Sequence, residues 1–461
     1  MTHPWIIWPG LLLLALYLGL YVAIFGWIVR VVRRRLGLSV FLVAPFAWTA
    51  IEWLKSSGEL GCPWGDLGYA LAQQPVWIQG ASVVGASGLS TWIVCVNALL
   101  AAAIAKFMSR RFVEAGLRLT LGLALVALPP IWGAKRLRAA NAAPSQGAPR
   151  AVPSIGRVAL IQPNIASDQK WNPTFQDSVV ESLYGLTRRA VDSDTLRIDL
   201  IVWPETALPF YVRLEPLKLR RLLDTARELG TPILAGYPDA RLSSAGDVTT
   251  HNAAGLVLAS GAISGQYEKM HLVPFGERIP FQGLFPFLGH FDLGQAEWTP
   301  GTERVVFGGV GPPFGVLICF ESIFADHARR YRDEGAEYLV NITNDEWFGR
   351  SAGPVQHADL AVLRSVELGM GLVRAANTGI SMIVDPYGRI LARTRLFEAA
   401  VVTGAIPAPL PPTLYARWGD WVTLLSVVVV VVLLAAAWFR PVGRRAEPLS
   451  ILKTPPTFPG V

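Results

Sequence analysis

Three segments of the sequence combine a short apolar run with a side chain that can do chemistry. Glu205 follows an Ile-Val-Trp-Pro sequence, Lys269 lies in the segment 267–277, and Cys319 follows Val-Leu-Ile. A thiol has an ordinary pKa of about 8.5 and must lose its proton before it attacks a carbonyl carbon. A carboxylate in an apolar pocket can accept that proton and later return it, and an ammonium group can stabilise the thiolate and the oxyanion. The combination predicts acyl transfer in two half-reactions through an acyl-cysteine.

Each of these residues taken alone has an ordinary structural explanation. A cysteine at the end of a strand is most often a small buried apolar residue, and a lysine is usually solvated. Glu205 after Trp-Pro fits the start of a helix, and Glu321 fits a charge at a helix N-terminus. The prediction therefore depends on the three residues together.

The composition predicts a protein that is embedded in a membrane. Of 461 residues, 52% are hydrophobic and 16% are charged, and the mean hydropathy is +0.39. The runs 4–29 and 421–438 contain no charged residue, and a helix needs about 20 apolar residues to cross the hydrocarbon core. We expect an N-terminal helical domain over residues 1–138, with four spans, and a C-terminal spanning helix over 419–439. The spans are expected at 9–29, 38–54, 86–105, 117–134 and 420–438; the second contains Glu52, and the fourth contains Pro129 and Pro130.

Basic residues gather beside the expected spans in three clusters. Because the chain crosses the membrane once in each span, all three clusters lie on the same side of the membrane. The clusters are Arg30, Arg33, Arg34 and Arg35; Lys106, Arg110, Arg111 and Arg118; and Arg440, Arg444 and Arg445. The positive-inside rule makes that side cytoplasmic. Residues 440–461 are then a cytoplasmic tail, whereas the N-terminus and the segment 135–420 lie outside. Because topology explains the net charge of +7, we expect no nucleic-acid partner.

The segment between the fourth and fifth spans has the pattern of a soluble α/β domain. Residues 139–156 are rich in Ala, Pro, Ser and Gly and are predicted to form a linker. Amphipathic stretches, such as 217–229 and 358–372, separate several short apolar runs. The runs are 158–161, 200–202, 233–235, 254–258, 316–318, 338–340 and 381–384. Strands that alternate with helices indicate a layered α/β domain, which we place at 157–410.

The reactive segments also resemble those of a known family. The Glu, Lys and Cys segments are similar, in the same chain order, to the motifs of the nitrilase superfamily. Further segments resemble the apolipoprotein N-acyltransferase family within it. These are Lys269 to Glu277 (Lys-Met-His-Leu-Val-Pro-Phe-Gly-Glu), Asn341 to Gly349, Gln356-His357, Arg374 to Gly379, Glu52-Trp53-Leu54, Pro63-Trp64 with Gly68-Tyr69, Asn97, and Tyr415 to Asp420. The resemblance covers nearly the whole chain.

The resemblance implies a fold and a role for each matched residue. The fold would be a multi-span helical membrane domain joined to a nitrilase-like αββα sandwich. By position, Glu205 would be the general base, Lys269 the oxyanion stabiliser and Cys319 the nucleophile. The supporting residues would be Glu277 and Glu321 beside the site, Trp171 near the substrate entrance, and Phe320, where many members carry tyrosine.

The resemblance also implies the substrates and the location. The acyl donor would be a phospholipid, usually phosphatidylethanolamine, and the acceptor would be the α-amino group of the diacylglyceryl cysteine of an apolipoprotein. The enzyme would be a monomer in the bacterial inner membrane, with its catalytic domain in the periplasm. We expect no cofactor or metal, since the three cysteines and six histidines have no metal-binding spacing. Members of the family normally carry more spans before the catalytic domain, so we expect this chain to lack about three helices.

Three other functions fit parts of the sequence. A membrane-anchored amidase or nitrile hydrolase could use the same three side chains on a small substrate. The segment 349–353 matches the G-x-S-x-G pattern of serine hydrolases, but that motif needs a strand directly before it and a helix directly after it. A transporter or scaffold with an inactive domain is the third alternative. However, apart from Arg118 and Asp420 at the ends of two spans, Glu52 is the only charged residue within an expected span, which is too few for a proton relay.

Overall fold

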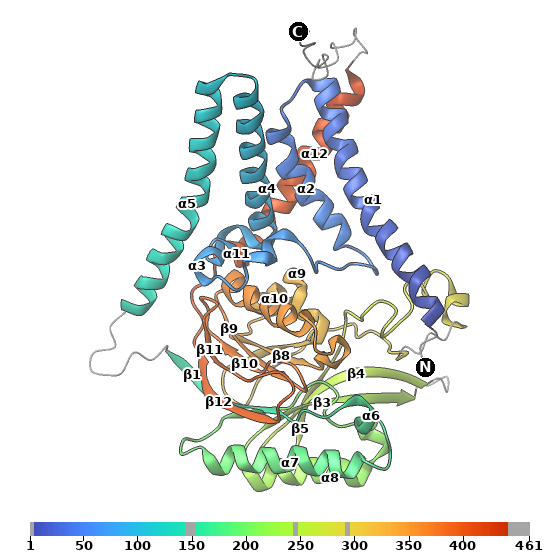
Figure 1. Cartoon of the computed structure of the whole chain (residues 1–461). Coiled ribbons are helices and arrows are strands. Elements are labelled where there is room, and N and C mark those ends of the chain that lie inside the picture. Colours follow the sequence, from blue (N-terminus) through green and yellow to red (C-terminus); the bar gives the residue numbers. More distant parts are fainter. Residues whose placement is uncertain (1–3, 143–152, 243–247, 291–295, 441–461) are drawn as a thin grey trace, which may run out of the picture.

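The computed structural model describes residues 4–142, 153–242, 248–290 and 296–440 (Figure 1). Long helices from both ends of the chain stand together at one end of the molecule, and two stacked β-sheets form the other end. The long helices are α1 (Pro4–Leu36), α2 (Val40–Lys55), α4 (Ala81–Met108), α5 (Phe112–Ala142) and α12 (Trp421–Phe439). The C-terminal tail expected at 440–461 lies almost entirely outside the described residues.

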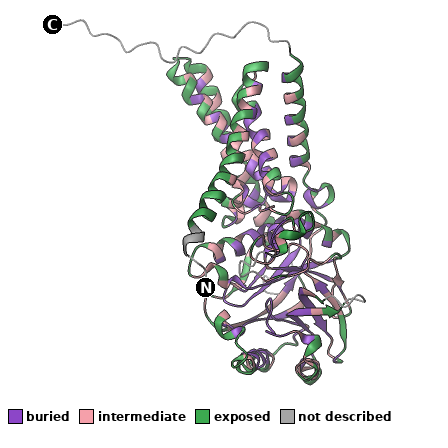
Figure 2. Ribbon diagram, turned by 90° about the vertical axis from the view of Figure 1, so that its right-hand side faces the viewer, coloured by how far each residue is buried: buried purple, intermediate pink, exposed green. Residues whose placement is uncertain are grey.

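Four helices within the described ranges are long and apolar enough to cross a membrane. They are Trp8–Leu36, Ala81–Met108, Phe112–Asn141 and Trp421–Phe439. Figure 2 shows that much of their surface is exposed, and that surface is largely apolar, as expected for helices that face lipid. The expected span 38–54 corresponds to α2, whose 16 residues extend about 24 Å, less than the hydrocarbon core of about 30 Å.

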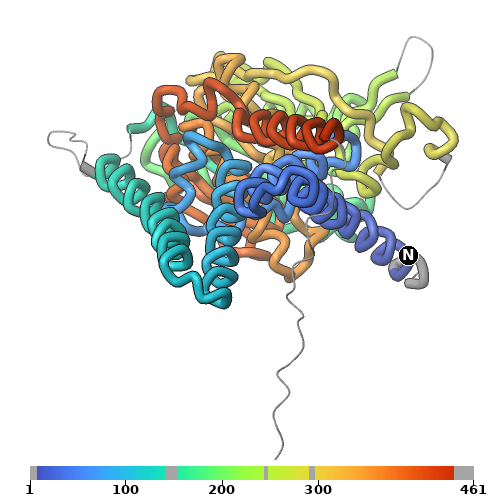
Figure 3. Tube along the Cα trace, turned by 90° about the horizontal axis from the view of Figure 1, so that it is seen from above, coloured from blue at the N-terminus to red at the C-terminus, as the bar shows by residue number. Residues whose placement is uncertain are grey.

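The chain runs alternately up and down through the five long helices (Figure 1). As a result, the end of α1, the α4–α5 connection and the end of α12 lie at the end of the molecule far from the sheets. Nη1 of Arg440 donates a hydrogen bond to the carbonyl oxygen of Arg35 at 2.9 Å, which joins two of the expected basic clusters. Viewed from above, the helices cover only part of the sheet domain (Figure 3).

The sheet domain is a four-layered αββα sandwich. One sheet has the strand order β12-β1-β2-β3-β4-β5, and the other has the order β11-β10-β9-β8-β7-β6. Helices α7 (Gln176–Ser193) and α8 (Pro216–Leu229) pack on the first sheet, and α9 (Ala325–Asp333) and α10 (Gly353–Leu368) pack on the second. The strands are β1 (Ser154–Gln162), β2 (Leu200–Val202), β3 (Ile233–Leu242), β4 (Val248–Val257), β5 (Ile263–Glu268), β6 (Val306–Phe307), β7 (Phe314–Ile318), β8 (Tyr338–Thr343), β9 (Gly371–Ala376), β10 (Met382–Val384), β11 (Ile390–Arg393) and β12 (Ala400–Pro407).

Parallel pairing brings the reactive strand ends together. In the first sheet, β2 lies between β1 and β3 and is parallel to both, and in the second sheet β7, β8 and β9 are parallel. These strands read as continuous apolar runs because helices cover the outer face of each sheet and the other sheet covers the inner face. Further short elements of this part of the chain are α6 (Ser167–Lys170), η2 (Val212–Leu214), η3 (Pro286–His290), η4 (Cys319–Ile323), η5 (Asp345–Phe348) and, after the last strand, α11 (Leu414–Trp418).

Two expected boundaries were wrong. The linker expected at 139–156 is helical up to Ala142 and belongs to β1 from Ser154 onward, and residues 143–152 lie outside the described part. The amphipathic stretch 358–372 is not one helix, because α10 ends at Leu368 and β9 begins at Gly371. Gly369 ends the helix with a left-handed backbone (φ 64°), which is a common helix C-cap.

The α2–α4 connection (residues 56–80) joins the helices to the sandwich. It contains η1 (Leu67–Leu71) and α3 (Pro75–Ile78) and lies on the α10 side of the sandwich. Nε2 of Gln73 donates to Asp359 at 2.7 Å, and the hydroxyl of Tyr69 donates to the carbonyl oxygen of Ile323 at 3.2 Å. Ile78 is fully buried in the same apolar core as the second sheet. The helical part is therefore packed against the sandwich.

Candidate active site

Glu205 lies in a buried turn just beyond the carboxyl end of β2. Its Oε1 accepts Nδ2 of Asn252 at 2.7 Å and Nζ of Lys269 at 3.3 Å, and its Oε2 accepts the backbone N–H of Asn344 at 2.8 Å. Gly236 of β3 permits the turn, because a Cβ there would lie 2.8 Å from the Cα of Glu205. Donors from three separate elements thus fix the orientation of the carboxylate.

Lys269 follows β5 and is 1% exposed. Its Nζ lies 2.8 Å from Oε1 of Glu277 and 3.3 Å from Oε1 of Glu205. Burial alone would lower the pKa of Lys269, but the carboxylates of Glu277 and Glu205 outweigh burial and raise the pKa above its ordinary value. The side chain is therefore a charged ammonium at neutral pH.

Glu277 is held in turn by its own partners. Its Oε2 accepts the backbone N–H of Val273 at 2.8 Å. Burial raises the pKa of the Glu277 carboxyl, whereas the Lys269 ammonium acts in the opposite direction. The segment from Lys269 to Glu277 thus folds back on itself, which brings the Glu277 carboxylate to the Lys269 ammonium.

Cys319 is the first residue of η4, directly after β7. Its φ of 51° is in the left-handed region, which costs a residue other than glycine roughly 1–3 kcal/mol and is typical of functional positions. Burial, and then the charge of Glu205, raise the pKa of the Cys319 thiol, whereas Lys269 acts to lower it. The thiol is therefore protonated at neutral pH and lies within electrostatic reach of the other two expected residues.

Glu321 connects the cysteine turn to the lysine segment and is fully buried. Its Oε1 accepts the hydroxyl of Tyr267 at 2.6 Å and the backbone N–H groups of Met270 at 2.7 Å and His271 at 3.1 Å. Its Oε2 accepts the backbone N–H of Ile318 at 2.8 Å. One carboxylate thus binds the residues that follow Lys269 and the residue that precedes Cys319.

The α2–α4 connection reaches the immediate surroundings of Cys319. Phe320 packs in an apolar cluster to which Trp64 and Tyr69 of this connection contribute. Nε1 of Trp64 donates to Oε1 of Gln356 at 3.1 Å, and the Trp64 ring lies 5.5 Å from that of His357. A residue from the helical part therefore lies beside the turn that carries the cysteine.

Comparisons with known proteins identify the family of this chain. A carbon-nitrogen hydrolase model matches residues 157–410, and a model of the apolipoprotein N-acyltransferase N-terminal domain matches residues 1–99. The apolipoprotein N-acyltransferase of Geobacter metallireducens is 37% identical over 436 residues, which are 93% of this chain and 81% of the relative. That of Brucella melitensis is 34% identical over 94% of this chain and 79% of the relative. The chain belongs to the apolipoprotein N-acyltransferase family.

Solved structures also resemble the chain. An amidase of the nitrilase superfamily from Nesterenkonia AN1, solved as a cysteine-to-alanine mutant, is 19% identical. The match has a TM-score of 0.43 and covers 58% of this chain and 95% of the amidase.

Trp171 directly follows α6 and, within the described part of the chain, makes no hydrogen bond or ring contact with the three reactive side chains. It is 46% exposed and lines a groove of about 520 Å³ together with Phe210 and Trp298. The neighbouring Lys170 is buried, and its Nζ donates to the carbonyl oxygen of Glu205 at 3.2 Å. Burial lowers the pKa of Lys170 to about 8. Trp171 is thus connected to the catalytic turn through its neighbour and is not in contact with the carboxylate in the described contacts.

Sequence reasoning missed two residues that hold Glu205. Asn252 and Asn344 both bond its carboxylate, and Nδ2 of Asn252 also lies 3.4 Å from Oε1 of Glu277. Asn252 lies within β4 directly before its apolar residues, and a polar residue next to a buried apolar run was the available signal. Asn344 acts through its backbone, which no residue pattern reveals.

A buried polar network also lies beneath Cys319. One ring nitrogen of His357 lies 2.7 Å from Oδ1 of Asp345, and the other lies 3.1 Å from the carbonyl oxygen of Cys319. Burial alone would raise the pKa of Asp345, but Arg374, which donates to Oδ2 at 2.8 Å, and His357 outweigh burial and lower that pKa. These partners already occupy the carboxylate. The cluster is therefore better suited to fix the cysteine backbone than to bind a metal.

Proposed function

We propose that this membrane enzyme transfers a fatty acyl group from a phospholipid to the N-terminal amine of an apolipoprotein. Cys319 would carry the acyl group as a thioester between two half-reactions. The donor would be phosphatidylethanolamine, and the acceptor would be the α-amino group of a diacylglyceryl cysteine. The proposal is supported by the ion pair of Glu205 with Lys269, by the influence of both charges on the Cys319 thiol, and by the connection of the helical part that packs beside Phe320.

The first half-reaction acylates the cysteine. Glu205 takes the proton from Sγ of Cys319 while Sγ attacks the ester carbonyl carbon of the phospholipid. A C–S bond forms, and the C–O bond of the ester then breaks. Glu205 returns the proton to the departing oxygen, which leaves as a lysophospholipid. Because the thiol rests protonated, removal of its proton is part of this step and requires the base.

The second half-reaction moves the acyl group to nitrogen. The neutral α-amine of the acceptor attacks the thioester carbonyl carbon, a C–N bond forms, and the C–S bond breaks. Glu205 takes the proton that the amine loses and returns it to the sulfur of Cys319. The products are an amide on the lipoprotein and the original thiol, so the enzyme is ready for another cycle without any cofactor.

Lys269 would stabilise the oxyanion in both half-reactions. The carbonyl oxygen becomes negative in each tetrahedral intermediate, and a buried ammonium stabilises such a charge far better than water does. Glu277 would keep Lys269 charged and in place, and Glu321 would hold the lysine and cysteine segments in register. Phe320 would line the acyl side of the site, and Trp171 would border the path by which substrate enters.

The helical part would bring the domain to its lipid substrates. The two basic clusters joined by Arg440 and Arg35 lie at the end away from the sandwich, which favours a cytoplasmic position for that end. The catalytic domain would then lie on the periplasmic side of the inner membrane. The chain would act as a monomer, since both lipids can reach one active site in turn.

Labelled phospholipid tests the proposal directly. Full-length protein incubated with phosphatidylethanolamine that carries a labelled acyl chain should retain label on Cys319, in a bond that hydroxylamine cleaves. Addition of a diacylglyceryl-cysteine peptide should move the label to a hydroxylamine-resistant amide. Cys319→Ala should do neither while it remains folded, and transfer by this variant would refute the mechanism.

The alternative of a small-substrate amidase is not favoured. The family match extends over residues 1–99 and relatives match along most of the chain, so the helical part belongs to the same functional unit. Nor is a serine hydrolase favoured, since the segment 349–353 follows the 3₁₀ turn η5 and not a strand. Hydrolysis of short amides without any thioester from phospholipid would reverse this conclusion.

A further inference from the structure

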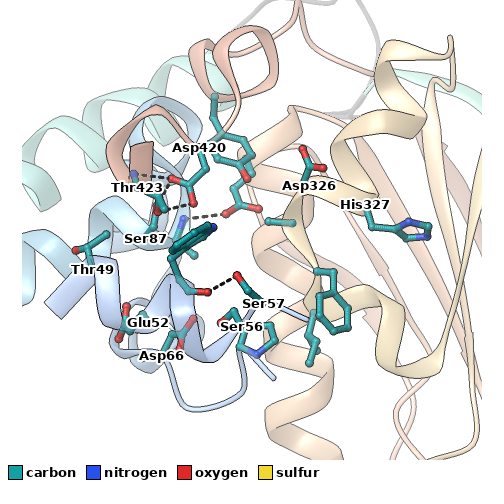
Figure 4. A pocket seen from close by; sticks show the side chains of 18 of the residues that line it. Thr49, Glu52, Ser56, Ser57, Asp66, Ser87, Asp326, His327, Asp420 and Thr423 are labelled. Carbon is teal, nitrogen blue, oxygen red and sulfur yellow. Dashed lines mark hydrogen bonds between the residues drawn. The ribbon is translucent and has the colours of Figure 1, made fainter. Parts of the chain in front are cut away.

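A second cavity lies between the helical part and the sandwich, beside the active-site turn. It has a volume of about 800 Å³ and is bordered by α2, the α2–α4 connection, α12, and the segment from Ile323 to Arg330 (Figure 4). Cys319, Glu205 and Lys269 are not among its lining residues. The mechanism proposed above therefore makes no use of it.

Glu52 gives this cavity a buried carboxylate with one unused oxygen. The residue is 6% exposed, and its Oε1 accepts Nε1 of Trp48 at 2.8 Å and the backbone N–H of Leu67 at 2.9 Å. Its Oε2 is buried and has no hydrogen-bond partner among the described residues. The Ser90 hydroxyl lies near the Glu52 carboxyl and accepts the Gly68 backbone N–H at 2.8 Å, and its own O–H forms no hydrogen bond with Oε2 in this described region. A buried carboxylate oxygen without a donor is costly, so a donor from a bound molecule would stabilise it.

Asp66 adds a second carboxylate next to Glu52 on the same wall (Figure 4). Its Oδ1 lies 2.5 Å from Nζ of Lys55. Burial, and then the charge of Glu52, raise the pKa of Asp66 to about 7 even with that lysine present. Two adjacent carboxylates thus share the single ammonium group of Lys55, and a second cation between them would relieve their repulsion.

The opposite wall of the cavity contributes positive charge. Arg304 and Arg330 line it, and each uses its Nε in an ion pair, with Glu334 at 2.7 Å and Asp326 at 2.8 Å respectively. A guanidinium has five N–H donors, so the terminal nitrogens of both side chains can still bind an anion such as a phosphate. The cavity thus has an acidic wall from the helices and a basic region from the sandwich.

The third property of the cavity is its contact with the lipid-facing helices. Trp53 of α2 and Leu424 of α12 line it, and they are 49% and 67% exposed. Leu424 lies in the first turn of α12, where that helix would leave the membrane surface. A molecule in the cavity could therefore place its charged end between the walls and its apolar chains along the helices.

We propose that this cavity binds the headgroup of an aminophospholipid, with its primary ammonium at Glu52 and Asp66 and its phosphate toward Arg304 and Arg330. The proposal rests on the acyl transfer proposed above and adds a site that selects the donor by its headgroup. A simple divalent cation fits less well, because such ions need several free oxygen ligands. Here Asp66 is paired with Lys55, and the oxygens of Asp420 bind Ser87 and Thr423.

Lipid retention by an inactive protein tests the site without any chemistry. The full-length Cys319→Ala variant is reconstituted in nanodiscs of phosphatidylcholine that contain equal amounts of phosphatidylethanolamine and phosphatidylglycerol. Lipids that remain bound after extraction into detergent are then measured by mass spectrometry. We expect phosphatidylethanolamine to be enriched by about tenfold or more over phosphatidylglycerol, as one charge-assisted hydrogen bond would give. Equal retention of the two lipids would overturn the proposal.

Glu52→Gln in the same background identifies the acidic wall. Glutamine keeps the oxygen that accepts Trp48 and Leu67, so the fold should survive, but the enrichment should disappear. Glu114→Gln is the matched control, because Glu114 forms its ion pairs in the α4–α5 connection at the other end of the helices. Unchanged enrichment in Glu52→Gln, or an equal loss in Glu114→Gln, would contradict the assignment.

Arg330→Gln is a second variant that does not depend on a buried residue. In nanodiscs that also contain diacylglycerol, which has no phosphate, it should reduce the retention of phosphatidylethanolamine and of phosphatidylglycerol relative to diacylglycerol. Preferential retention of a phosphate-free diacylglyceryl-cysteine peptide would instead assign the cavity to the acceptor and reject our proposal. Since all these measurements use Cys319→Ala, a failure of thioester formation in the parent protein would leave their outcome unaffected.

Discussion

Lys269 and Glu277 form the shorter of the two ion pairs in the active site, with 2.8 Å between Nζ and Oε1, compared with 3.3 Å to Glu205. The nearer carboxylate thus provides most of the compensation for the buried ammonium. Glu205 can then give up its charge when it takes a proton, without leaving Lys269 uncompensated. Two carboxylates beside one ammonium are therefore consistent with separate functions, one for charge compensation and one for proton transfer.

Replacement of Glu277 by glutamine should weaken the enzyme most at high pH. The carboxylates raise the pKa of Lys269, so removal of one of them lowers that pKa. The ammonium would then lose its proton at a lower pH, and the alkaline limb of the pH–rate profile should move toward neutrality. We expect acylation at pH 7 to fall by about tenfold to a hundredfold, as for loss of an electrostatic contact in an active site. Thioester formation measured between pH 6 and 10 gives both quantities.

Glu268→Gln is the control for that shift. Glu268 neighbours Lys269 in sequence, but its carboxylate pairs with Arg241 and His251 on the outside of the cluster. Its replacement should leave the alkaline limb where it is. An equal displacement in both variants would mean that overall charge, and not the Lys269–Glu277 pair, sets the profile.

Much of the fold could be predicted because the strands are continuous apolar runs. All seven expected runs correspond to strands, since strands that are covered on both faces of a layered sheet consist mostly of apolar residues. The stretch 358–372 was wrongly taken as one amphipathic stretch because apolar residues continue from α10 into β9. The periodicity of these residues alone does not mark the boundary between the helix and the strand. Gly369 was the signal for the helix end.

The expected reactive residues could be identified from their types, but their partners could not. Glu205, Lys269 and Cys319 each end or follow a strand, where a chemical side chain stands out against apolar neighbours. Asn344 donates through its backbone, and Trp64 contacts Gln356 across 292 positions of sequence. Such contacts depend on how distant elements pack, which local patterns do not contain.

Glu205→Gln should have opposite effects on two reactions of the same sulfur. The charge of Glu205 raises the pKa of Cys319, so its removal should lower that pKa and increase the thiolate fraction at pH 8. Alkylation by iodoacetamide needs only the thiolate and should become faster, by up to about tenfold for each pKa unit. Acylation by phospholipid needs the general base and should become slower, by about a hundredfold or more.

Mass spectrometry of digested protein can separate Cys319 from Cys62 and Cys95, the other two free cysteines. Cys95 lies on α4, away from the cluster, so its alkylation rate serves as an internal control for protein opening. If both reactions of Cys319 slow together, Glu205 holds the site in shape and is not the base.

Glu321→Gln should damage stability and acylation together. The carboxylate accepts donors on both oxygens, whereas glutamine has only one acceptor and would direct an N–H toward a donor. Loss of a charged acceptor for a buried N–H costs about 1.5–3 kcal/mol. We expect a lower melting temperature and loss of thioester formation. Glu59→Gln is a suitable control, because Glu59 accepts the Phe281 backbone N–H at the surface. An active Glu321→Gln variant would show that the lysine and cysteine segments keep their register without this carboxylate.

The orientation of the molecule in the membrane can be tested with two exposed serines at opposite ends. Ser109 lies in the α4–α5 connection among basic residues, and Ser154 begins β1 on the sandwich. In a variant that lacks Cys62 and Cys95, Ser154→Cys should react with a membrane-impermeant maleimide added to intact cells with a permeable outer membrane. Ser109→Cys should react only after the inner membrane is opened, because the positive-inside rule places that end in the cytoplasm. The reverse pattern would place the catalytic domain in the cytoplasm and exclude periplasmic lipoproteins as its acceptors.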